Sequence, residues 1–139
     1  MDVHDPQTRS YNMSRIKGKQ TKPEELVAKY LFSRGLRYRR NVKTLPGKPD
    51  IVLKKYKTVI FVNGCFWHLH ERCKYFVWPE NNQEFWRDKL LKNKERDIAV
   101  KETLEKLGWK VLVVWECELK HDNREKTLIR LYSNIVSAN

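Results

Sequence analysis

Two distant segments of this chain carry cysteines and histidines that can act together only if the fold brings them close. Cys65, His70 and Cys73 fall within nine consecutive positions, and Cys117 comes just after the apolar run WKVLVVW. Three thiolates and one imidazole are a usual ligand set for a structural zinc ion, which takes four protein ligands. If the strands that end near residues 63 and 116 are neighbours, their ends can complete the set. We therefore expect a zinc site, with His68 as an alternative to His70 and buried metal-free cysteines as the alternative to a metal.

The apolar pattern predicts helices and strands in the order α-β-β-β-α-β-α. Thr21 and Glu24 have the spacing of a capping box, and Pro23 suits a first turn, so a helix should begin near Thr21 and end at Gly35. Strands are then expected at 36–42, 49–54, 57–63 and 109–115, and helices at 84–107 and 123–136. Strands that pair first as a meander and then through a helical crossover give a mixed sheet flanked by helices, which is an α/β fold.

The predicted hairpin at 49–63 carries the first candidate for chemistry. Lys55-Tyr56 is a short connection, so the strands on either side should pair antiparallel and place Asp50 opposite Val62, give or take one position. A strand-borne aspartate near the end of its partner strand is a common Mg²⁺ ligand in phosphodiester hydrolases, because this ion prefers oxygen ligands. The alternative is that Pro-Asp only caps a turn. The carbonyl of Val62 and the side chain of His68 should lie near Asp50.

The apolar stripe of the helix at 84–107 includes two polar residues. The stripe runs through Trp86, Leu90, Asn93, Asp97, Val100, Leu104 and Leu107. An inward carboxylate is costly unless it is paired, so we expect Asp97 to accept a hydrogen bond from His68, which would fix the tautomer of the imidazole and raise its basicity. A purely structural hydrogen bond is the alternative. Asn93 can share this polar pocket, and Glu24 either serves the capping box or reaches a metal-bound water.

The charge of the chain favours a polyanionic partner. Lys and Arg number 29 against 17 Asp and Glu, a net charge of +12, so nucleic acid is expected rather than a merely solubilising charge. Residues 1–20 are polar and basic, and we expect a flexible arm in which Met13, Arg15 and Lys17 contact DNA, with a plain disordered terminus as the alternative. Residues 21–139 should form a single domain.

The sequence also predicts where the protein acts. No apolar run approaches the ~20 residues of a membrane span, and no signal-peptide core is present. An odd number of cysteines without a secretory signal favours thiolates in a reducing cytosol over disulfides. We therefore expect a cytoplasmic protein that makes no membrane contact, and nothing in the sequence suggests oligomerisation, so a monomer is expected.

Five segments together resemble the very short patch repair (Vsr) DNA mismatch endonucleases of bacteria. They are MDVHDPQTRSYNM, LPGKPDIVL, VIFVNGCFWHLHERC, EFWRDKLLKNKERD and LGWKVLVVWEC, in this order and spacing. The resemblance implies a fold like that of type II restriction endonucleases, with a structural zinc. It also implies Mg²⁺-dependent nicking of duplex DNA on the 5′ side of the thymine in a T:G mismatch. Such mismatches arise when 5-methylcytosine deaminates, so a cytosine-5 DNA methyltransferase and mismatch repair proteins are expected functional partners.

The resemblance implies roles for individual residues. Asp50 matches the catalytic aspartate that binds Mg²⁺, and the carbonyl of Val62 matches a backbone ligand of the same ion. His68 and Asp97 match a histidine–aspartate pair, and Glu24 matches a further active-site acid. The zinc ligands are matched by Cys65, His70, Cys73 and Cys117, and the aromatic residues that wedge into the duplex are matched by Phe66, Trp67 and Trp86. Other aromatic residues, namely Phe61, Trp109 and Trp115, are expected in the core.

The sequence departs from the family pattern in two places. Asn63 stands where familiar members carry a histidine, and the loop between His70 and Cys73 is one residue longer. The second hairpin strand also ends in Val62-Asn63-Gly64, where the wider nuclease superfamily usually has an acid and a lysine.

Two other functions fit part of the sequence. One is a restriction-type or structure-specific nuclease without mismatch preference, and the other is a zinc-stabilised DNA-binding module without catalysis. Asp50 and the inward Asp97 argue against the second function, because binding alone needs neither carboxylate.

Overall fold

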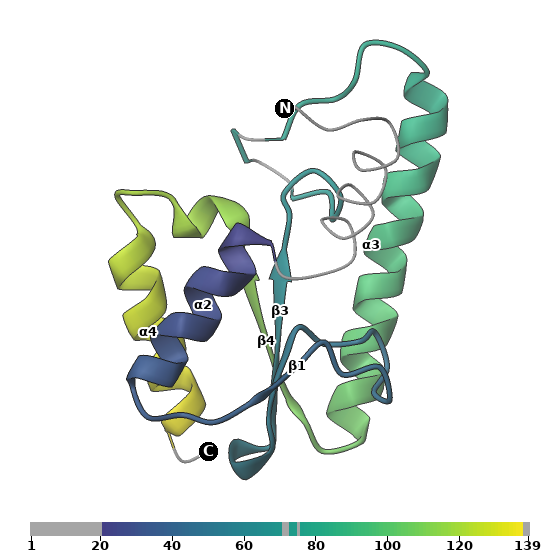
Figure 1. Cartoon of the computed structure of the whole chain (residues 1–139). Coiled ribbons are helices and arrows are strands. Elements are labelled where there is room, and N and C mark those ends of the chain that lie inside the picture. The colour runs from purple at the N-terminus through teal and green to yellow at the C-terminus, as the bar shows by residue number, and fades with distance from the viewer. Residues whose placement is uncertain (1–20, 71–72, 75, 138–139) are drawn as a thin grey trace, which may run out of the picture.

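A four-stranded mixed β-sheet forms the centre of the computed structural model, which describes residues 21–70, 73–74 and 76–137 (Figure 1). The strands are β1 (Arg39–Arg40), β2 (Ile51–Leu53), β3 (Thr58–Asn63) and β4 (Lys110–Trp115), and they lie in this order across the sheet. β1, β2 and β3 pair antiparallel, whereas β3 and β4 are parallel. The expected meander followed by a crossover is therefore confirmed, as is the α/β class.

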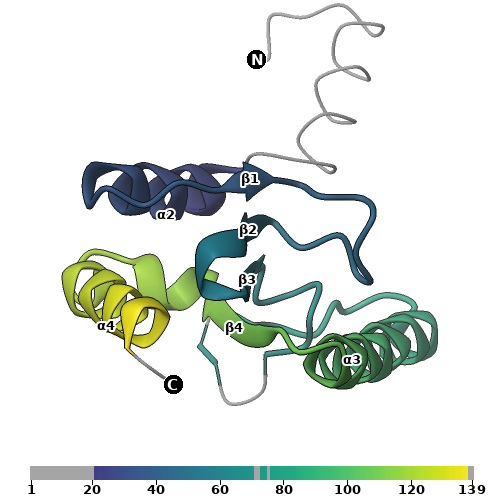
Figure 2. The ribbon, with the colours of Figure 1, turned by 90° about the horizontal axis from the view of Figure 1, so that it is seen from below.

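Helices cover both faces of the sheet (Figure 2). α2 (Lys22–Ser33) and α4 (Arg124–Val136) lie on one face, and α3 (Gln83–Lys106), the crossover between β3 and β4, lies on the other. Each face has its own apolar core. Leu31, Ile60 and Leu131 belong to the core under α2 and α4, and Val59 and Leu104 belong to the core under α3. No helix among the described residues is long and apolar enough to cross a membrane.

The start of α2 follows the predicted capping box. The Thr21 side chain accepts a hydrogen bond from the amide of Glu24, and the Glu24 carboxylate accepts one from the amide of Thr21. Two of the amides that a helix start leaves unpaired are thereby satisfied. The helix stops where Gly35 adopts φ +89°, a conformation that glycine reaches without steric cost.

The first two strands are shorter than expected. A strand was predicted at 36–42, but β1 holds only Arg39 and Arg40, because Asn41 turns to φ +50°. β2 begins only after Lys48, at φ +51°, and Pro49. Pairing nevertheless continues irregularly past the strand ends, since the amide of Asn41 donates to the carbonyl of Asp50 at 2.9 Å.

The hairpin between β2 and β3 has nearly the predicted register. A short 3-10 helix, η1 (Lys54–Tyr56), and Lys57 in the left-handed conformation make the turn. Ile51 pairs with Ile60, so continuing the register by one position sets Asp50 opposite Phe61, one residue from the predicted partner and within the stated range.

Most of the α3 stripe faces inward, but not all of it. Leu90 and Leu104 are fully buried, whereas Leu107 is 55% exposed, so its expected place in the core was wrong. Leu107 lies just past the last helical turn, where the chain reverses at Gly108 with φ +96°.

The aromatic residues expected in the core are only partly buried. Phe61 and Trp109 pack against the core under α3. Trp115 instead stacks on the ring of His70, with ring centroids 3.9 Å apart. The prediction that Trp115 lies in the core was therefore wrong, because this side chain lies at the end of β4, where the sheet meets the histidine-bearing loop.

Candidate active site and metal centre

A cavity of about 730 Å³ opens where the start of α2, the β2–β3 hairpin, the loop after β3 and α3 meet. Several predicted site residues from these four elements line it together. They are Glu24, Asp50, Val62, His68 and Asn93, joined by Lys48, Asn63, Trp67, Lys89 and Glu116. Residues that are far apart in sequence therefore face one space, and that space holds both acidic and basic groups.

Asp50, which lines this cavity, is held by the neighbouring strand. Its Oδ2 accepts a hydrogen bond of 2.6 Å from the amide N–H of Val62. Burial, a hydrogen bond with Glu24 and the charge of that carboxyl raise the pKa of Asp50 from 3.8 to about 8, although the Val62 amide and Arg40 pull it down. The contact made by Val62 uses its N–H, and the role expected for its carbonyl remains a prediction.

Two roles were left open for Glu24 from the sequence, namely capping α2 or reaching the active site. Its contacts in the structure fit both roles. Oε1 accepts the Thr21 amide at 3.0 Å, completing the capping box, and Oε2 accepts from the side-chain amide of Asn41 at 3.2 Å. The residue is only 3% exposed and also hydrogen-bonds with Asp50. One carboxyl therefore both caps α2 and adjoins Asp50.

His68 and Asp97 make the expected pair. Nδ1 of His68 lies 2.6 Å from Oδ2 of Asp97 on α3. One turn earlier on the same helix, Asn93 donates to the carbonyl of Trp67 at 3.0 Å, so α3 holds the loop at two successive points. With Asp97 accepting from Nδ1–H, the lone pair of Nε2 is left as the acceptor of the ring.

His68 also borders a second cavity. This cavity, of about 450 Å³, lies between α3 and β4 and is lined by Asp97, Ile98, Val113 and Trp115 among others. Asn63 is buried and lines both cavities. The imidazole of His68 and the side chain of Asn63 thus form part of the wall between a polar space and a largely apolar one.

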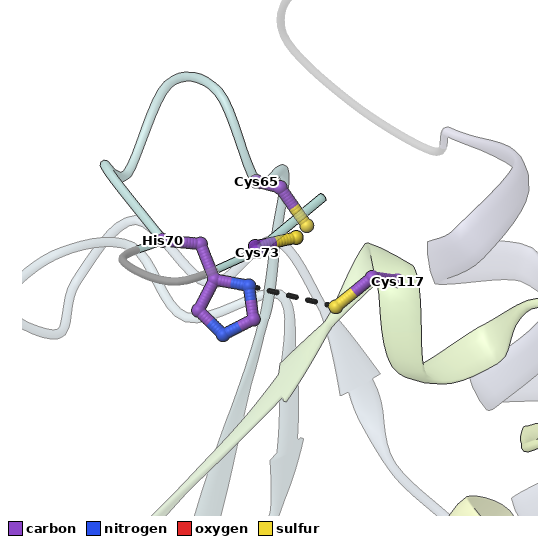
Figure 3. Close-up of side chains that lie close together, drawn as sticks. All are labelled: Cys65, His70, Cys73 and Cys117. Carbon is purple, nitrogen blue, oxygen red and sulfur yellow. Dashed lines mark hydrogen bonds between the residues drawn. The ribbon is translucent and has the colours of Figure 1, made fainter. Parts of the chain in front are cut away.

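The predicted metal ligands gather at the ends of β3 and β4 (Figure 3). One ligand atom from each of Cys65, His70, Cys73 and Cys117 lies within 4.8 Å of every other. Tetrahedral zinc with Zn–S bonds of about 2.3 Å needs sulfur atoms about 3.8 Å apart, so this spacing is close to that of a bound site.

The sheet register explains how the ligands meet. Asn63 pairs with Trp115 in the parallel β3–β4 ladder, and Cys65 and Cys117 each follow two residues later. Nδ1 of His70 lies 3.5 Å from Sγ of Cys117, and the amide of His70 donates to the carbonyl of Cys65 at 3.0 Å. The structure therefore places His70, and not His68, with the cysteines.

The thiols of this cluster are poorly suited to stay charged without a metal. Burial, followed by the neighbouring thiols Cys73 and Cys65, raises the pKa of Cys117 to about 12. Burial also raises the pKa of Cys65. A cation among the sulfur atoms would reverse this tendency, because a coordinating thiol is deprotonated by the metal.

The three predicted wedge aromatics form one contact group beside the cavity. Ring centroids of Phe66, Trp67 and Trp86 lie 5.2 to 5.9 Å apart, and Trp67 is 47% exposed. The group extends through Phe76, which stacks on Phe66 at 5.7 Å, and Phe85, which contacts Trp86 at 5.2 Å. Phe76 and Phe85 were not predicted as site residues. The aromatic run KYFVW, which contains Phe76, and the dipeptide Phe85-Trp86 were the sequence signals that could have indicated them.

Two lysines on the cavity wall were also missed. Lys48 follows Gly47 in the loop before β2, and Lys89 lies on α3. In a chain with 29 Lys and Arg residues, no sequence pattern separates these two from the rest. Met13, Arg15 and Lys17, the DNA contacts expected in the arm, lie outside the described residues.

Comparisons with known proteins show the family to which the chain is similar. A family model described as DNA mismatch endonuclease Vsr matches residues 1–74. The DNA mismatch endonuclease Vsr of Escherichia coli is 47% identical over 125 residues, covering 90% of this chain and 78% of that protein. The type II nicking enzyme V.NmeAIP of Neisseria meningitidis is 54% identical over 120 residues, covering 86% of this chain and 85% of that protein.

The mixed α/β sheet, the polar cavity with its histidine–aspartate pair and these similarities define a DNA endonuclease. More narrowly, the chain belongs to the DNA mismatch endonuclease Vsr family.

Proposed function

We propose that this protein nicks duplex DNA on the 5′ side of the thymine in a T:G mismatch in a Mg²⁺-dependent reaction. Such a nick would start very short patch repair of deaminated 5-methylcytosine. The observation that carries the proposal is that Glu24, Asp50 and His68 line one cavity, with His68 backed by Asp97 at 2.6 Å. The name of the E. coli relative supports the mismatch as substrate.

The residues present fit a divalent cation at Asp50. Burial, followed by the hydrogen bond with the adjoining Glu24, raises the pKa of Asp50 to about 8. A positive charge bound beside Asp50 would favour its ionised form. Asp50, the carbonyl of Val62 and water held by Glu24 would supply the oxygen ligands that Mg²⁺ prefers. The ion would stabilise charge on the phosphate and on the departing oxygen.

His68 is suited to act as the general base. Its Nδ1–H donates to Asp97, so Nε2 can take a proton from a water in the cavity. The oxygen of that water then bonds to phosphorus as the bond from phosphorus to the 3′ oxygen breaks. A proton from solvent completes the 3′ hydroxyl, and the 5′ phosphate remains on the other side of the nick.

The second metal position fits structural zinc. Four protein ligands leave no open coordination position, so the ion would brace the loop and take no part in hydrolysis. Phe66, Trp67 and His68 all lie between the ligands Cys65 and His70. A zinc ion would therefore fix the base and the wedge in one rigid segment.

The exposed aromatic group supports recognition of a mismatch. Phe66, Trp67 and Trp86 contact one another beside the cavity. Inserting such rings between base steps costs a few kcal/mol of unstacking, and a mismatched step is easier to open than a paired one. Wedging at this position would thus favour a T:G site over a matched duplex.

Further parts of the proposal concern the whole protein. We propose a fold like that of the type II restriction endonucleases, which the order of strands and helices supports. We also propose that a single domain at 21–139 follows a DNA-contacting arm at 1–20. We propose a cytoplasmic monomer that works with a cytosine-5 DNA methyltransferase and with mismatch repair proteins.

A nicking enzyme without mismatch preference is the second candidate, since several relatives are named type II nicking enzymes. One assay separates the two. Matched and T:G duplexes are incubated with the protein and Mg²⁺, and the nicked strand and position are read on a denaturing gel. We expect a nick 5′ to the mismatched thymine only, and Asp50→Ala should abolish it while DNA binding stays measurable. Equal cutting of both duplexes would favour the second candidate, and normal cutting by Asp50→Ala would contradict the active site.

A further inference from the structure

We propose that Lys48 binds the scissile phosphate and stabilises the charge that develops on its non-bridging oxygens during cleavage. This inference rests on the proposed function, because it assigns a further residue to the same cavity. None of the comparisons assigns a role to this lysine. The shape of the loop that carries Lys48, the position of this residue and the charges in the cavity support this role.

The loop that carries Lys48 is anchored on both sides. Gly47 packs so closely on α3 that an added Cβ would lie 2.4 Å from Cγ1 of Val100, a distance that no side chain tolerates. The amide of Lys48 donates to the carbonyl of Leu45 at 3.1 Å, and the amide of Val42 donates to the carbonyl of Pro49 at 3.2 Å. The backbone at Lys48 is therefore fixed by contacts before and after it.

Lys48 itself has a conformation that a lysine rarely adopts. Its φ is +51°, in the left-handed region, directly after Gly47 at φ +74°. A glycine would occupy this position with no steric cost, whereas a side chain with a Cβ is disfavoured there. Unfavourable backbone conformations of this kind concentrate at functional sites. Lys57 has the same conformation in the turn between β2 and β3, but only Lys48 of the two lines the cavity. A lysine at position 48 is explained if its ammonium group is needed there.

The position of Lys48 matches that need. Lys48 lies two residues before Asp50, is exposed, and lines the same cavity as Asp50 and His68. Among the described residues, no ion pair involves Lys48. β3 ends in Val62-Asn63 and brings no cation to the cavity from the paired strand. Arg40 on β1 lowers the pKa of Asp50 but is paired with Glu25 at 3.1 Å. Lys48 is the cation of the cavity lining that lies nearest to Asp50 in sequence.

The charges in the cavity explain why a cation is useful. Glu24, Asp50 and Glu116 contribute carboxyl groups to the lining, and a Mg²⁺ ion bound there would be largely neutralised by them. Phosphodiester hydrolysis adds negative charge to the phosphate oxygens in the transition state. A positioned ammonium group strengthens its interaction as that charge grows, and such an interaction accelerates the chemical step more than it tightens binding.

Five variants test the proposal, and one of them, Lys89→Met, removes the charge of the other lysine that lines the cavity. Lys48→Met removes the charge and keeps the side-chain length, Lys48→Arg keeps a charge, and Lys48→Gly removes the charge while relieving the backbone. Lys54→Met is the matched control, because Lys54 is an exposed lysine in η1 at the far end of the same hairpin. Single-turnover nicking of a T:G duplex is measured with saturating enzyme and Mg²⁺, the dissociation constant is measured without Mg²⁺, and thermal unfolding reports the fold.

We expect Lys48→Met and Lys48→Gly to lower the single-turnover rate constant by about tenfold to a hundredfold. Affinity should fall much less, Lys48→Arg should recover most of the rate, and Lys54→Met should match the wild type. The melting temperature of Lys48→Gly should be equal to or above that of the wild type, which separates lost charge from lost fold.

Three results would overturn the proposal. The first is a Lys48→Met rate equal to that of Lys54→Met, and the second is a loss of affinity with an unchanged rate at saturation. The third is slow cleavage by Lys89→Met but not by Lys48→Met, which would assign the cation to α3. Failure of the wild type to nick any duplex with Mg²⁺ would instead contradict the proposed function, so the two failures are distinguishable.

Discussion

The protonation of Asp50 depends on which charges share its cavity. Burial and the adjoining Glu24 raise its pKa to about 8. A carboxyl group whose pKa is raised on folding binds its proton more tightly in the folded protein. Its stabilising contribution is complete below about pH 4 and is lost as the pH rises through about 8. Without divalent cations, the stability of the folded protein therefore falls between about pH 4 and pH 8, because the unfolded chain releases this proton at a lower pH than the folded protein does.

The direction of this pH dependence predicts a difference in thermal stability between the wild type and Asp50→Asn. In buffer without added Mg²⁺ at about pH 8, the variant should melt higher, by roughly 5 °C, because the neutral amide carries no buried charge. The difference should shrink as the pH approaches about 4. Thermal unfolding across this range measures it, and added Mg²⁺ should raise the melting temperature of the wild type only. A difference that stays constant with pH would contradict the assignment.

The carboxylate of Asp97 orients the imidazole of His68 through one hydrogen bond of 2.6 Å. Asp97→Asn keeps the shape but can present an amide N–H to Nδ1, which favours the tautomer with its proton on Nε2. That tautomer cannot accept a proton from water, so nicking should slow by about a hundredfold or more, with little change in DNA affinity. Lys92, which pairs with Asp88 on the exposed side of α3, offers Lys92→Ala as a control. A nearly normal rate for Asp97→Asn would leave the pair a structural hydrogen bond.

At the scale of elements, the loop after β3 and the part of α3 from Trp86 to Asp97 act as one unit. Asn93 and Asp97 on α3 bind Trp67 and His68 of the loop, and Trp86 on the same helix contacts Phe66 and Trp67. The aromatic group and the histidine therefore keep a fixed relation to each other. A wedge placed in the duplex would set the position of the scissile phosphate relative to His68.

Trp67→Ala tests this coupling. Removing the exposed indole should reduce the preference for T:G over T:A duplexes by at least about tenfold, because the variant no longer gains from the easily opened step. Competition cleavage with both duplexes in one tube measures the preference. Phe32→Ala is a suitable control, since Phe32 is 54% exposed on α2 and contacts Arg37 instead of the site. Unchanged discrimination by Trp67→Ala would remove the wedge.

At the scale of the whole molecule, the Cys3His cluster ties the meander to the part of the chain beyond the crossover. Cys65, His70 and Cys73 follow β3, whereas Cys117 lies in η2 (Glu116–Leu119), between β4 and α4. Forty-six residues, 64–109, separate β3 from β4. A metal ion bound to Cys65 and Cys117 would link the chain just after β3 to the chain just after β4, and would so close a long loop.

Cys117→Ser should therefore lose zinc and stability together. We expect less than one equivalent of bound zinc by elemental analysis and a melting temperature lower by several degrees, because the closed loop opens. Nicking should fall as well, since His68 lies between two ligands. Adding a chelator to the wild type should reproduce these changes. Full zinc content in Cys117→Ser would show that this residue is no ligand.

Much of this architecture could be predicted because its determinants are local or periodic. Thr21 and Glu24 specify the start of α2 within four residues, and the apolar stripe of α3 placed Asp97 on the inward face. The short connection at Lys55-Tyr56 fixed the hairpin register to within one position.

Other features had no such signal. The contact between Glu24 and Asp50 joins positions 26 residues apart, and the capping box already accounted for Glu24. A left-handed lysine at position 48 is unexpected, because the residue type that favours this conformation is glycine. Trp115 was predicted to be a core residue because its strand is apolar, yet its ring stacks on His70. In each case the feature depends on tertiary structure that the local sequence pattern does not specify.

The place of His68 between the two cavities has a practical consequence. His68 lines the polar cavity and, together with Asp97, also lines the largely apolar cavity of about 450 Å³. The volume of this second cavity is within the usual range for sites that bind drug-sized compounds. A small inhibitor seated in that second cavity could push the imidazole out of line. Such a compound would not have to compete with the DNA at all.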